Sequence, residues 1–419
     1  MASVPFSAPL AAELSAGVLE RFLRYVRVDT QSEEGASTFP STAKQLDLSR
    51  ILADELREIG LEDVELNEFG YVIATLPGTP GAPVIGLIAH VDTTPESPGA
   101  GVSPIVHEDY AGERIVLPGD PSQILDPAEE PALAARVGHD IVTSDGTTLL
   151  GADDKAGVAE IMAAVAYLRG TAEPRATVRI AFTVDEEVGR GADHFDVEAF
   201  GAEAAYTLDG SGVGEVEIET FSARQLKVQI EGRGEHPGTA KGKLVNAVKL
   251  AAEFVAALPR DTLSPETTEG REGFVHPSRI VASVEEAVVI VIVRDHDDEE
   301  FERHTELVLQ LAREIEEREP RARVTVDIWD QYHNMRSVIE QHPRIVANAE
   351  EAIRRAGVEP VRSIIRGGTD GARLTAMGLP TPNLFTGGQK YHSRREWASV
   401  QDMAAAAAMV VELVRVWGE

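Results

Sequence analysis

His90 and Asp92 are placed where their side chains could act on one ligand together. They follow residues 83–89, an almost continuous apolar run that is typical of a strand buried on both faces. Residues two apart in an extended chain share a face, so the imidazole of His90 and the carboxylate of Asp92 point the same way. A metal-bound histidine commonly donates its other ring N–H to a carboxylate. The pair therefore predicts a metal ligand with an orienting partner, although an isolated His-x-Asp can also be a structural accident.

Further carboxylates and a second histidine stand at or just after other predicted strands. They are Asp153, Asp154, Glu186, Glu187, Asp209 and His392. The pair Asp153 and Asp154 comes where a strand-like run turns into a helix, so it could cap that helix or bridge two cations. In the pair Glu186 and Glu187, one acid could bind a metal while the other handles protons, or both could be solvated in a turn. Each of the remaining two could be an ordinary loop residue.

Strands and helices alternate between these residues. Strands are predicted over residues 176–183 and 204–208, and an Ala-rich helix over residues 154–168. Such alternation favours an α/β sheet with helices on both sides, and ligands bind such a sheet at the carboxyl ends of its strands. Two histidines and three of the carboxylates would meet at that edge. This donor set suits zinc, cobalt or manganese.

A second set of elements interrupts the alternation between residues 222 and 331. The predicted elements are a strand over residues 223–231, a helix over 243–258, strands near 280–284 and 287–293, a helix over 297–318 and a strand over 323–328. This βαββαβ order matches a ferredoxin-like unit. The helix over residues 297–318 carries acidic residues in its first turn, where the helix dipole favours them. We therefore predict a mixed-sheet α/β catalytic domain over residues 1–221 and 332–419, with a lid domain of residues 222–331 inserted into it.

Composition excludes several classes of partner. The 419 residues carry a formal net charge of −31, which disfavours binding to nucleic acid and to anionic membrane surfaces. The chain has no cysteine, so any metal must be held by histidines and carboxylates. Residues 1–26 lack the basic start and the long apolar run of a signal peptide. No segment is apolar for long enough to span a bilayer. We therefore expect a cytoplasmic protein that binds neither nucleic acid nor membranes.

The series of motifs resembles a known enzyme family. In chain order it reads His90-Val91-Asp92, Gly151-Ala152-Asp153-Asp154-Lys155-Ala156-Gly157, Asp185-Glu186-Glu187-Val188-Gly189 and Asp209-Gly210. These segments look like the motifs of the two-zinc metallopeptidase family that contains aminoacylases, succinyl-diaminopimelate desuccinylase and peptidase T. The segments similar to the peptidase T branch in particular are His236-Pro237-Gly238-Thr239-Ala240-Lys241-Gly242, Asn334-Met335-Arg336, Arg366-Gly367-Gly368-Thr369-Asp370-Gly371 and Asn383-Leu384-Phe385-Thr386-Gly387-Gly388. Val184 and residues 389–394 differ from the family's motifs, and the difference at residues 389–394 affects the rim of the expected substrate pocket. Because the series covers nearly the whole chain in order, it is far more specific than any single motif.

The resemblance implies a centre with two metal ions. Asp153 would bridge the two ions, His90 and Asp209 would complete one site, and Glu187 and His392 would complete the other. Two divalent cations per chain are therefore expected, with zinc as the first choice and cobalt or manganese as alternatives. The resemblance also implies a cis peptide bond after Asp153, since a bridging carboxylate must project sharply from the corner between strand and helix.

The resemblance further implies catalytic and substrate-binding residues. The predicted catalytic residues are Glu186 as general base, Asp92 as the partner that orients His90, and His236 as a group that stabilises the oxyanion. The predicted substrate-binding residues are Arg294, Asn334 and Arg366. The planar forks of the two arginines suit a peptide carboxylate. The sequence leaves open whether His236 serves its own subunit or the partner subunit of a homodimer.

The resemblance therefore implies a metallo-aminopeptidase that releases the N-terminal residue from tripeptides. A metal-activated water would be the nucleophile and a glutamate the general base. The alternative is an amidohydrolase of the same family that acts on N-acyl amino acids or other short peptides. A catalytically inactive binding protein on this scaffold would have lost a ligand or the base, and none is missing. A dinuclear phosphoesterase would need a basic pocket, and the motifs do not fit that class.

Overall fold

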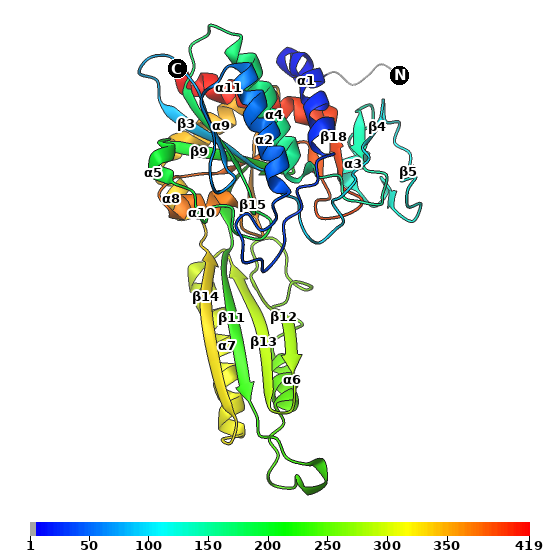
Figure 1. The fold of residues 1–419 in the computed structure, drawn as a ribbon, viewed down its shortest axis with the longest axis vertical. Coiled ribbons are helices and arrows are strands. Elements are labelled where there is room, and N and C mark those ends of the chain that lie inside the picture. Colours follow the sequence, from blue (N-terminus) through cyan, green and yellow to red (C-terminus); the bar gives the residue numbers. More distant parts are fainter. Residues whose placement is uncertain (1–5) are drawn as a thin grey trace. The chain divides into compact units, whose positions relative to one another are not determined.

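The computed structural model describes residues 6–419 and divides them into two compact units. The large unit comprises the residues up to Ile218 together with Ser337–Ser363 and Thr369–Glu419. The small unit comprises Glu219–Arg336 and Ile364–Gly368. Figure 1 shows the helices and strands of both units, coloured along the sequence. The chain therefore enters the small unit twice, the second time over one short segment.

An eight-stranded mixed sheet forms the centre of the large unit. Its strands, in spatial order, are β1 (Glu62–Leu66), β2 (Val72–Leu76), β8 (Thr177–Thr183), β3 (Val84–His90), β9 (Ala204–Gly210), β16 (Asn383–Phe385), β10 (Glu215–Thr220) and β15 (Val361–Ile365). Strands β8, β3, β9 and β16 run parallel, whereas β2 is antiparallel to β1 and β8, and β10 is antiparallel to β16. All but the first residue of β3 are buried, as its apolar run predicted. The parallel strands end at one edge of the sheet, so the residues that follow them lie close together.

Helices pack around this sheet. The long ones are α1 (Pro9–Tyr25), α2 (Gln45–Ile59), α4 (Ala152–Arg169), α9 (Pro343–Arg355) and α11 (Val400–Gly418), and the short ones are α5 (Val197–Phe200), α8 (Arg336–Ile339) and α10 (Asp370–Ala376). Helix α4 contacts β3, β9, α1 and α11, and nearly all of its residues are buried. Many of those residues are alanines, whose small side chains let neighbouring helices approach closely. This burial fixes α4 against β3 and β9, and with it the residues of its first turn.

A small satellite sheet in the large unit joins two distant parts of the chain. Its strands are β17 (Gly388–Gln389), β18 (Trp397–Ser399), β7 (Ile141–Thr143) and β4 (Ile105–His107). The pair β5 (Ile115–Val116) and β6 (Ile124–Leu125) and helix α3 (Pro131–Ala134) pack with it around a core that includes Trp397. The chain between β17 and β18 carries His392, so this sheet fixes both ends of that loop. The sequence analysis did not anticipate these short strands.

The small unit is a four-stranded antiparallel sheet with two helices. In chain order its elements are β11 (Ser222–Glu231), the 3₁₀ turn η1 (Pro237–Thr239), α6 (Ala247–Ala257), β12 (Phe274–Ala282), β13 (Glu286–Asp295), α7 (Asp298–Arg318) and β14 (Arg323–Tyr332). The spatial order is β12-β13-β11-β14. Both helices share one apolar core with alternate residues of β11 and β13. This arrangement confirms the predicted ferredoxin-like order and, with the mixed sheet of the large unit, the predicted fold class.

Two elements of the small unit begin away from their predicted positions. Strand β12 starts at Phe274, although the sequence predicted a strand only near residues 280–284. Pro277 argued against a strand in the first half of β12, because a proline is tolerated in a sheet only at an edge or a bulge. Strand β12 lies at the edge of its sheet and has a bulge next to Pro277. Helix α6 starts later than predicted because the side chain of Asn246 accepts the N–H groups of Val248 and Lys249 and caps it there.

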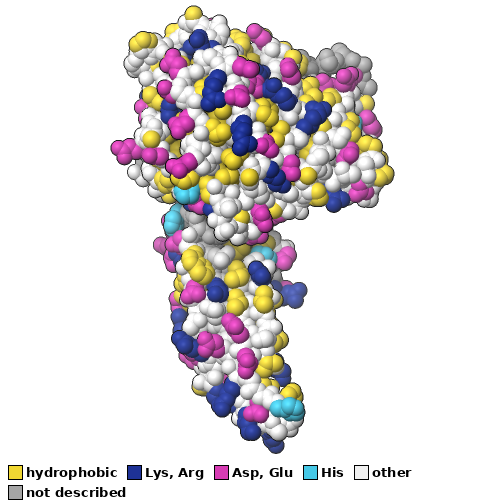
Figure 2. Space-filling model, in the orientation of Figure 1, with side chains coloured by type: hydrophobic (Ala, Val, Ile, Leu, Met, Phe, Trp, Pro, Cys, Tyr) yellow, Lys and Arg dark blue, Asp and Glu magenta, His cyan; other side chains and the backbone are white. Residues whose placement is uncertain are grey.

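The surface of the molecule mixes charges of both signs. Figure 2 shows acidic and basic side chains interspersed over the visible face of each unit, with apolar side chains between them. Among the helices of residues 6–419, none combines the length and the apolar character needed to cross a membrane.

Candidate metal centre

Three side chains of the large unit converge on one point at the sheet edge. His90 ends β3, Asp209 lies near the end of β9, and Asp153 lies in the first turn of α4. The Nε2 atom of His90 is 3.0 Å from Oδ1 of Asp153 and 3.7 Å from Oδ1 of Asp209. One donor atom from each residue falls within 4.8 Å of the other two, the spacing of a possible metal-binding group.

A second group of the same kind shares Asp153. Nε2 of His392 is 2.8 Å from Oε2 of Glu187 and 3.3 Å from Oδ2 of Asp153. The two oxygens of Asp153 therefore face different groups, one with His90 and one with His392. The structure thus brings together all five predicted metal ligands around one shared carboxylate.

The turn that carries Asp153 has an unusual backbone. Gly151 has a φ of 83°, and both Asp153 and Asp154 lie outside the helical region although they begin α4. The peptide bond between Asp153 and Asp154 is cis, which confirms the sequence prediction. Oδ1 of Asp154 accepts the N–H of Gly157, and Oδ2 accepts the N–H of His90. Asp154 therefore caps the start of α4 and holds the end of β3, whereas the carboxylate of Asp153 faces the two metal-binding groups.

Asp92 connects the two sides of the site. Its Oδ1 lies 3.3 Å from Nδ1 of His90, whose ring also approaches the backbone oxygen of Asp92 at 3.1 Å. The same carboxylate accepts the N–H of Glu186 at 3.0 Å and that of Glu187 at 3.2 Å. With Nδ1 engaged in this way, Nε2 of His90 is the nitrogen that remains for a ligand.

Glu186 lies beside this site with an unengaged carboxylate. Within residues 6–419 its side-chain oxygens have no hydrogen bond or ion pair, whereas its backbone is held by Asp92. Burial raises the pKa of Glu186 well above its usual value. A buried carboxylate that is positioned through its backbone and has a raised pKa suits a general base, because it holds a transferred proton more readily than an exposed carboxylate does.

A buried network that the sequence analysis did not identify holds the start of the Glu186 turn. Asp185 has a φ of 60°, a conformation that few residues other than glycine adopt. Its carboxylate accepts the N–H and the hydroxyl of Ser41 and the amide of Gln45, and its own N–H donates to Gln45. The partners lie about 140 residues away in sequence, which is why spacing alone could not reveal them.

The buried carboxylates of the site favour a bound positive charge. Burial, and then the charge of Asp153, raises the pKa of Glu187 to about 8 and that of Asp209 to about 7. Burial alone would lower the pKa of His392, but contacts with Asp153 and Glu187 raise it to about 11. Oε1 of Glu187 is buried without a hydrogen-bond partner among the described residues. Crowded carboxylates and an orphaned oxygen fit divalent cations with oxygen and imidazole ligands.

Two predicted residues of the small unit have side chains left for a ligand. His236 is exposed next to η1. Its Nδ1 accepts the N–H of Gly238, so Nε2 is the ring nitrogen that is left for a ligand. Arg294 lies in β13 with its guanidinium carbon 5.9 Å from the ring centres of both Phe274 and Tyr332. Its Nε is buried, and within the described chain the guanidinium has no hydrogen bond or ion pair.

The other two predicted residues of the small unit are engaged inside it. The amide of Asn334 donates to Glu219 and to the carbonyl of His296. The terminal nitrogens of Arg366 donate to the carbonyls of Thr268, Gly270 and Glu272 and to the hydroxyl of Thr268. Arg366 therefore holds the loop before β12, and its fork is already occupied.

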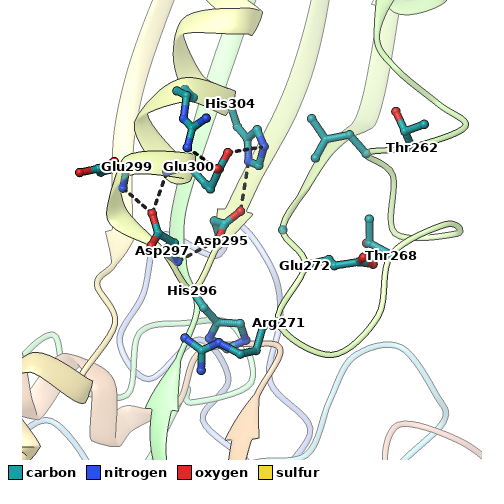
Figure 3. A pocket seen from close by; sticks show the side chains of 13 residues that line it. Thr262, Thr268, Arg271, Glu272, Asp295, His296, Asp297, Glu299, Glu300 and His304 are labelled. Carbon is teal, nitrogen blue, oxygen red and sulfur yellow. Dashed lines mark hydrogen bonds and ion pairs between the residues drawn. The ribbon is translucent and has the colours of Figure 1, made fainter.

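A cleft of about 510 Å³ lies between this loop and the start of α7. Figure 3 shows Thr262, Thr268, Arg271 and Glu272 on the loop side, with Asp295, Asp297, Glu299, Glu300 and His304 opposite them. The facing carboxylates are partly engaged, since Asp297 caps α7 and Asp295 pairs with His304 at 3.3 Å. None of the predicted site residues lines this cleft.

Comparison with known proteins places the chain in a family. Residues 150–416 match the model of peptidase family M20/M25/M40. A peptidase T of Geobacillus kaustophilus is 48% identical over 403 residues, covering 96% of this chain and 98% of that protein. A peptidase T of Clostridium perfringens is 47% identical over 405 residues, covering 96% and 99%.

Solved structures agree with the fold. Aminopeptidase PepT of Bacillus cereus superimposes with a TM-score of 0.74 at 24% identity, over 97% of this chain and 99% of that one. A tripeptidase of Staphylococcus aureus gives a TM-score of 0.77 at 22% identity, over 96% and 98%. A dinuclear metal-binding peptidase of Bacillus subtilis gives 0.66 at 17%, over 97% and 98%. The chain therefore belongs to peptidase family M20/M25/M40, and its near-complete match to the curated relatives places it among the peptidase T members of that family.

Proposed function

We propose that this peptide hydrolase is a metal-dependent aminopeptidase that releases the N-terminal residue from tripeptides. The observation that carries the proposal is the sharing of Asp153 between two metal-binding groups, with the unengaged carboxylate of Glu186 beside them. Relatives with nearly half of their residues in common are peptidase T proteins, and a structural neighbour is a tripeptidase. The cytoplasmic location and the homodimer remain predictions.

The five ligands divide into two sites. His90, Asp153 and Asp209 would hold one cation, and Asp153, Glu187 and His392 the other. Zinc is the first choice for this donor set, with cobalt or manganese as alternatives. When bound, two such cations supply positive charge that lowers the pKa of a coordinated water and polarises a peptide carbonyl.

The protein's own groups then handle the proton. Glu186 takes the proton from the attacking water and passes it to the leaving amine. Asp92 holds the backbone of Glu186 and the ring of His90, so it fixes the base relative to one ligand. His236 would place a ring nitrogen where negative charge develops on the carbonyl oxygen. In this proposal the large unit is the catalytic domain and the small unit a lid that carries His236.

The two arginines would have different tasks. Arg294 has a guanidinium that forms no ion pair within the described residues and lies 5.9 Å from the centres of two aromatic rings, so it is the better candidate for the C-terminal carboxylate of a tripeptide. Arg366 stays a second candidate, but it would have to release the carbonyls of the loop before β12 to form a fork with substrate. Asn334 would act by holding Glu219 in place.

Replacing Arg294 by alanine is expected to lower kcat/KM on a tripeptide by ~10-fold or more, equivalent to one charged hydrogen bond of ~1.5–3 kcal/mol. Amidating the C-terminus of the tripeptide should cost the wild-type enzyme about as much. The two changes remove the same contact, so the amide should lose little more with Arg294→Ala. Arg294→Lys should rescue poorly because a fork is directional.

Arg313→Ala is the matched control, since this arginine lies on the exposed side of α7 and, among the described residues, pairs with Glu306 alone. It should leave kcat/KM unchanged. Equal rates of the wild-type enzyme on a tripeptide, its amide and a hexapeptide would refute recognition of substrate length and leave a general aminopeptidase.

The alternative function is hydrolysis of N-acyl amino acids by the same centre. A free α-amino group distinguishes the substrates, so a tripeptide and its N-acetyl derivative should be compared at equal concentration. Release of the first residue from the free tripeptide only supports the aminopeptidase. Preference for the acetylated compound would favour the amidohydrolase.

A further inference from the structure

A buried carboxylate outside the ligand set grips the turn that carries Asp153. Glu396 is 1% exposed, and its Oε2 accepts the N–H of Leu150 at 2.8 Å and of Gly151 at 2.7 Å. Its Oε1 accepts the N–H of Asp153 at 3.0 Å. Three backbone donors of one turn therefore meet on a single side chain from a segment more than 240 residues later in the sequence.

This turn has little regular structure of its own to hold it. The residues at the start of α4 have no preceding helical turn whose carbonyls could accept their N–H groups. Gly151, Asp153 and Asp154 also depart from helical geometry. Hydrogen bonds from an N–H to a charged oxygen are shorter and stronger than those to a neutral one, so Glu396 can set this conformation.

The other end of Glu396 is tied to the loop of His392. Its N–H donates to the carbonyl of Ser393, next to His392, which has a φ of 61°. Trp397, the following residue, opens β18, pairs with Thr143 of β7 and is buried in the satellite core. Glu396 is thus held next to the satellite sheet by Trp397. Its carboxylate contacts the turn of Asp153, and its N–H contacts the loop of His392.

We propose that Glu396 is a positioning residue that sets the separation of Asp153 and His392, and through it the affinity of the second cation site. This inference rests on the proposed two-cation function. Glu187, the third member of that site, belongs to the turn held by Asp92 and Asp185, and Glu396 governs the other two members. The first site depends on Glu396 only through Asp153, so it should be affected less.

The test is Glu396→Gln, which keeps the size of the side chain but turns one oxygen into a donor that must face a backbone N–H. Metal-free protein is titrated with Zn²⁺ by calorimetry. We expect one of the two equivalents to bind 10- to 100-fold less tightly than in the wild type, the usual effect of removing a group that orients a ligand. The other equivalent and the Tm of the metal-free protein should change little. Excess Zn²⁺ should restore kcat.

Glu160→Gln is the matched control. Glu160 lies in α4, and its carboxyl group is as fully buried as that of Glu396. It accepts one N–H, from Gly387, and none from the turn of Asp153. It should titrate like the wild type. Glu396→Asp keeps the charge with a shorter reach, so it should give an intermediate affinity and serves if the glutamine variant does not fold.

Unchanged affinities in both Glu396 variants would overturn the inference. So would equal weakening of both equivalents together with a lower Tm of the metal-free protein, because that result indicates a general structural role. If the wild-type protein itself takes up fewer than two cations, the proposed function fails first, and the inference fails with it.

Discussion

Replacing Glu186 by glutamine is expected to lower kcat on a tripeptide by ~10²-fold or more while both cations stay bound, because only the proton acceptor is lost. The backbone of Glu186 is held by Asp92, and within the described residues its side chain forms no hydrogen bond or ion pair. The substitution should therefore leave the ligand cluster in place. Steady-state kinetics and metal analysis of the same sample measure both effects.

Glu187→Gln is the matched control for this experiment. It makes the same chemical change one residue later, but it removes a carboxylate that lies 2.8 Å from His392. We expect this variant to bind less metal, in contrast to Glu186→Gln. Near wild-type turnover of Glu186→Gln would show that another group is the base.

Changing Asp153 to asparagine should remove metal and activity together. Asp153 offers one oxygen to each group, and an amide has a single, uncharged oxygen in their place. Both sites should weaken, and the loss of turnover should be at least as large as that of the base variant, ~10²-fold. Metal content after dialysis and kcat at saturating tripeptide provide the measurement.

Asp196→Asn is the matched control, because it makes the same chemical change at a helix cap where asparagine can replace aspartate. The carboxylate of Asp196 caps α5 by accepting the N–H of Ala199, and asparagine is as good a cap as aspartate. This variant should keep both cations and full activity. If Asp153→Asn keeps two tightly bound cations, Asp153 does not bridge them.

Sequence was sufficient to find the residues of the metal-binding groups. His90, Glu187 and Asp209 end or follow parallel strands of the central sheet, which bring such residues to one edge whatever the length of the connections. Asp153 in the first turn of α4 and His392 in the loop between β17 and β18 were found from their motifs. His90 and Asp209 met in this way because β3 and β9 are neighbours in the sheet. The apolar run of β3 and the βαββαβ order of the small unit were likewise visible as patterns of hydrophobicity.

Residues that act through long-range contacts could not be found from spacing. Asp185 is braced by Ser41, and Asp153 by Glu396, across 144 and 243 positions. Neither pair forms a periodic pattern, since a side-chain hydrogen bond depends on the tertiary fold. Arg366 shows the converse case, because its motif suggested a substrate contact and its fork binds loop carbonyls. The identity of a motif therefore does not fix the partner of its side chain.

The central claim is that two cations around Asp153 drive release of the N-terminal residue of a tripeptide. It is tested most directly by stripping the protein of metal, titrating it with Zn²⁺ and following the products by mass spectrometry. We predict no cleavage by the stripped protein and a rate that rises until two equivalents per chain are bound, one for each group. The products should be the free first residue and the dipeptide that followed it. Full activity after stripping, saturation at a single equivalent, or release of the last residue instead of the first would contradict the account.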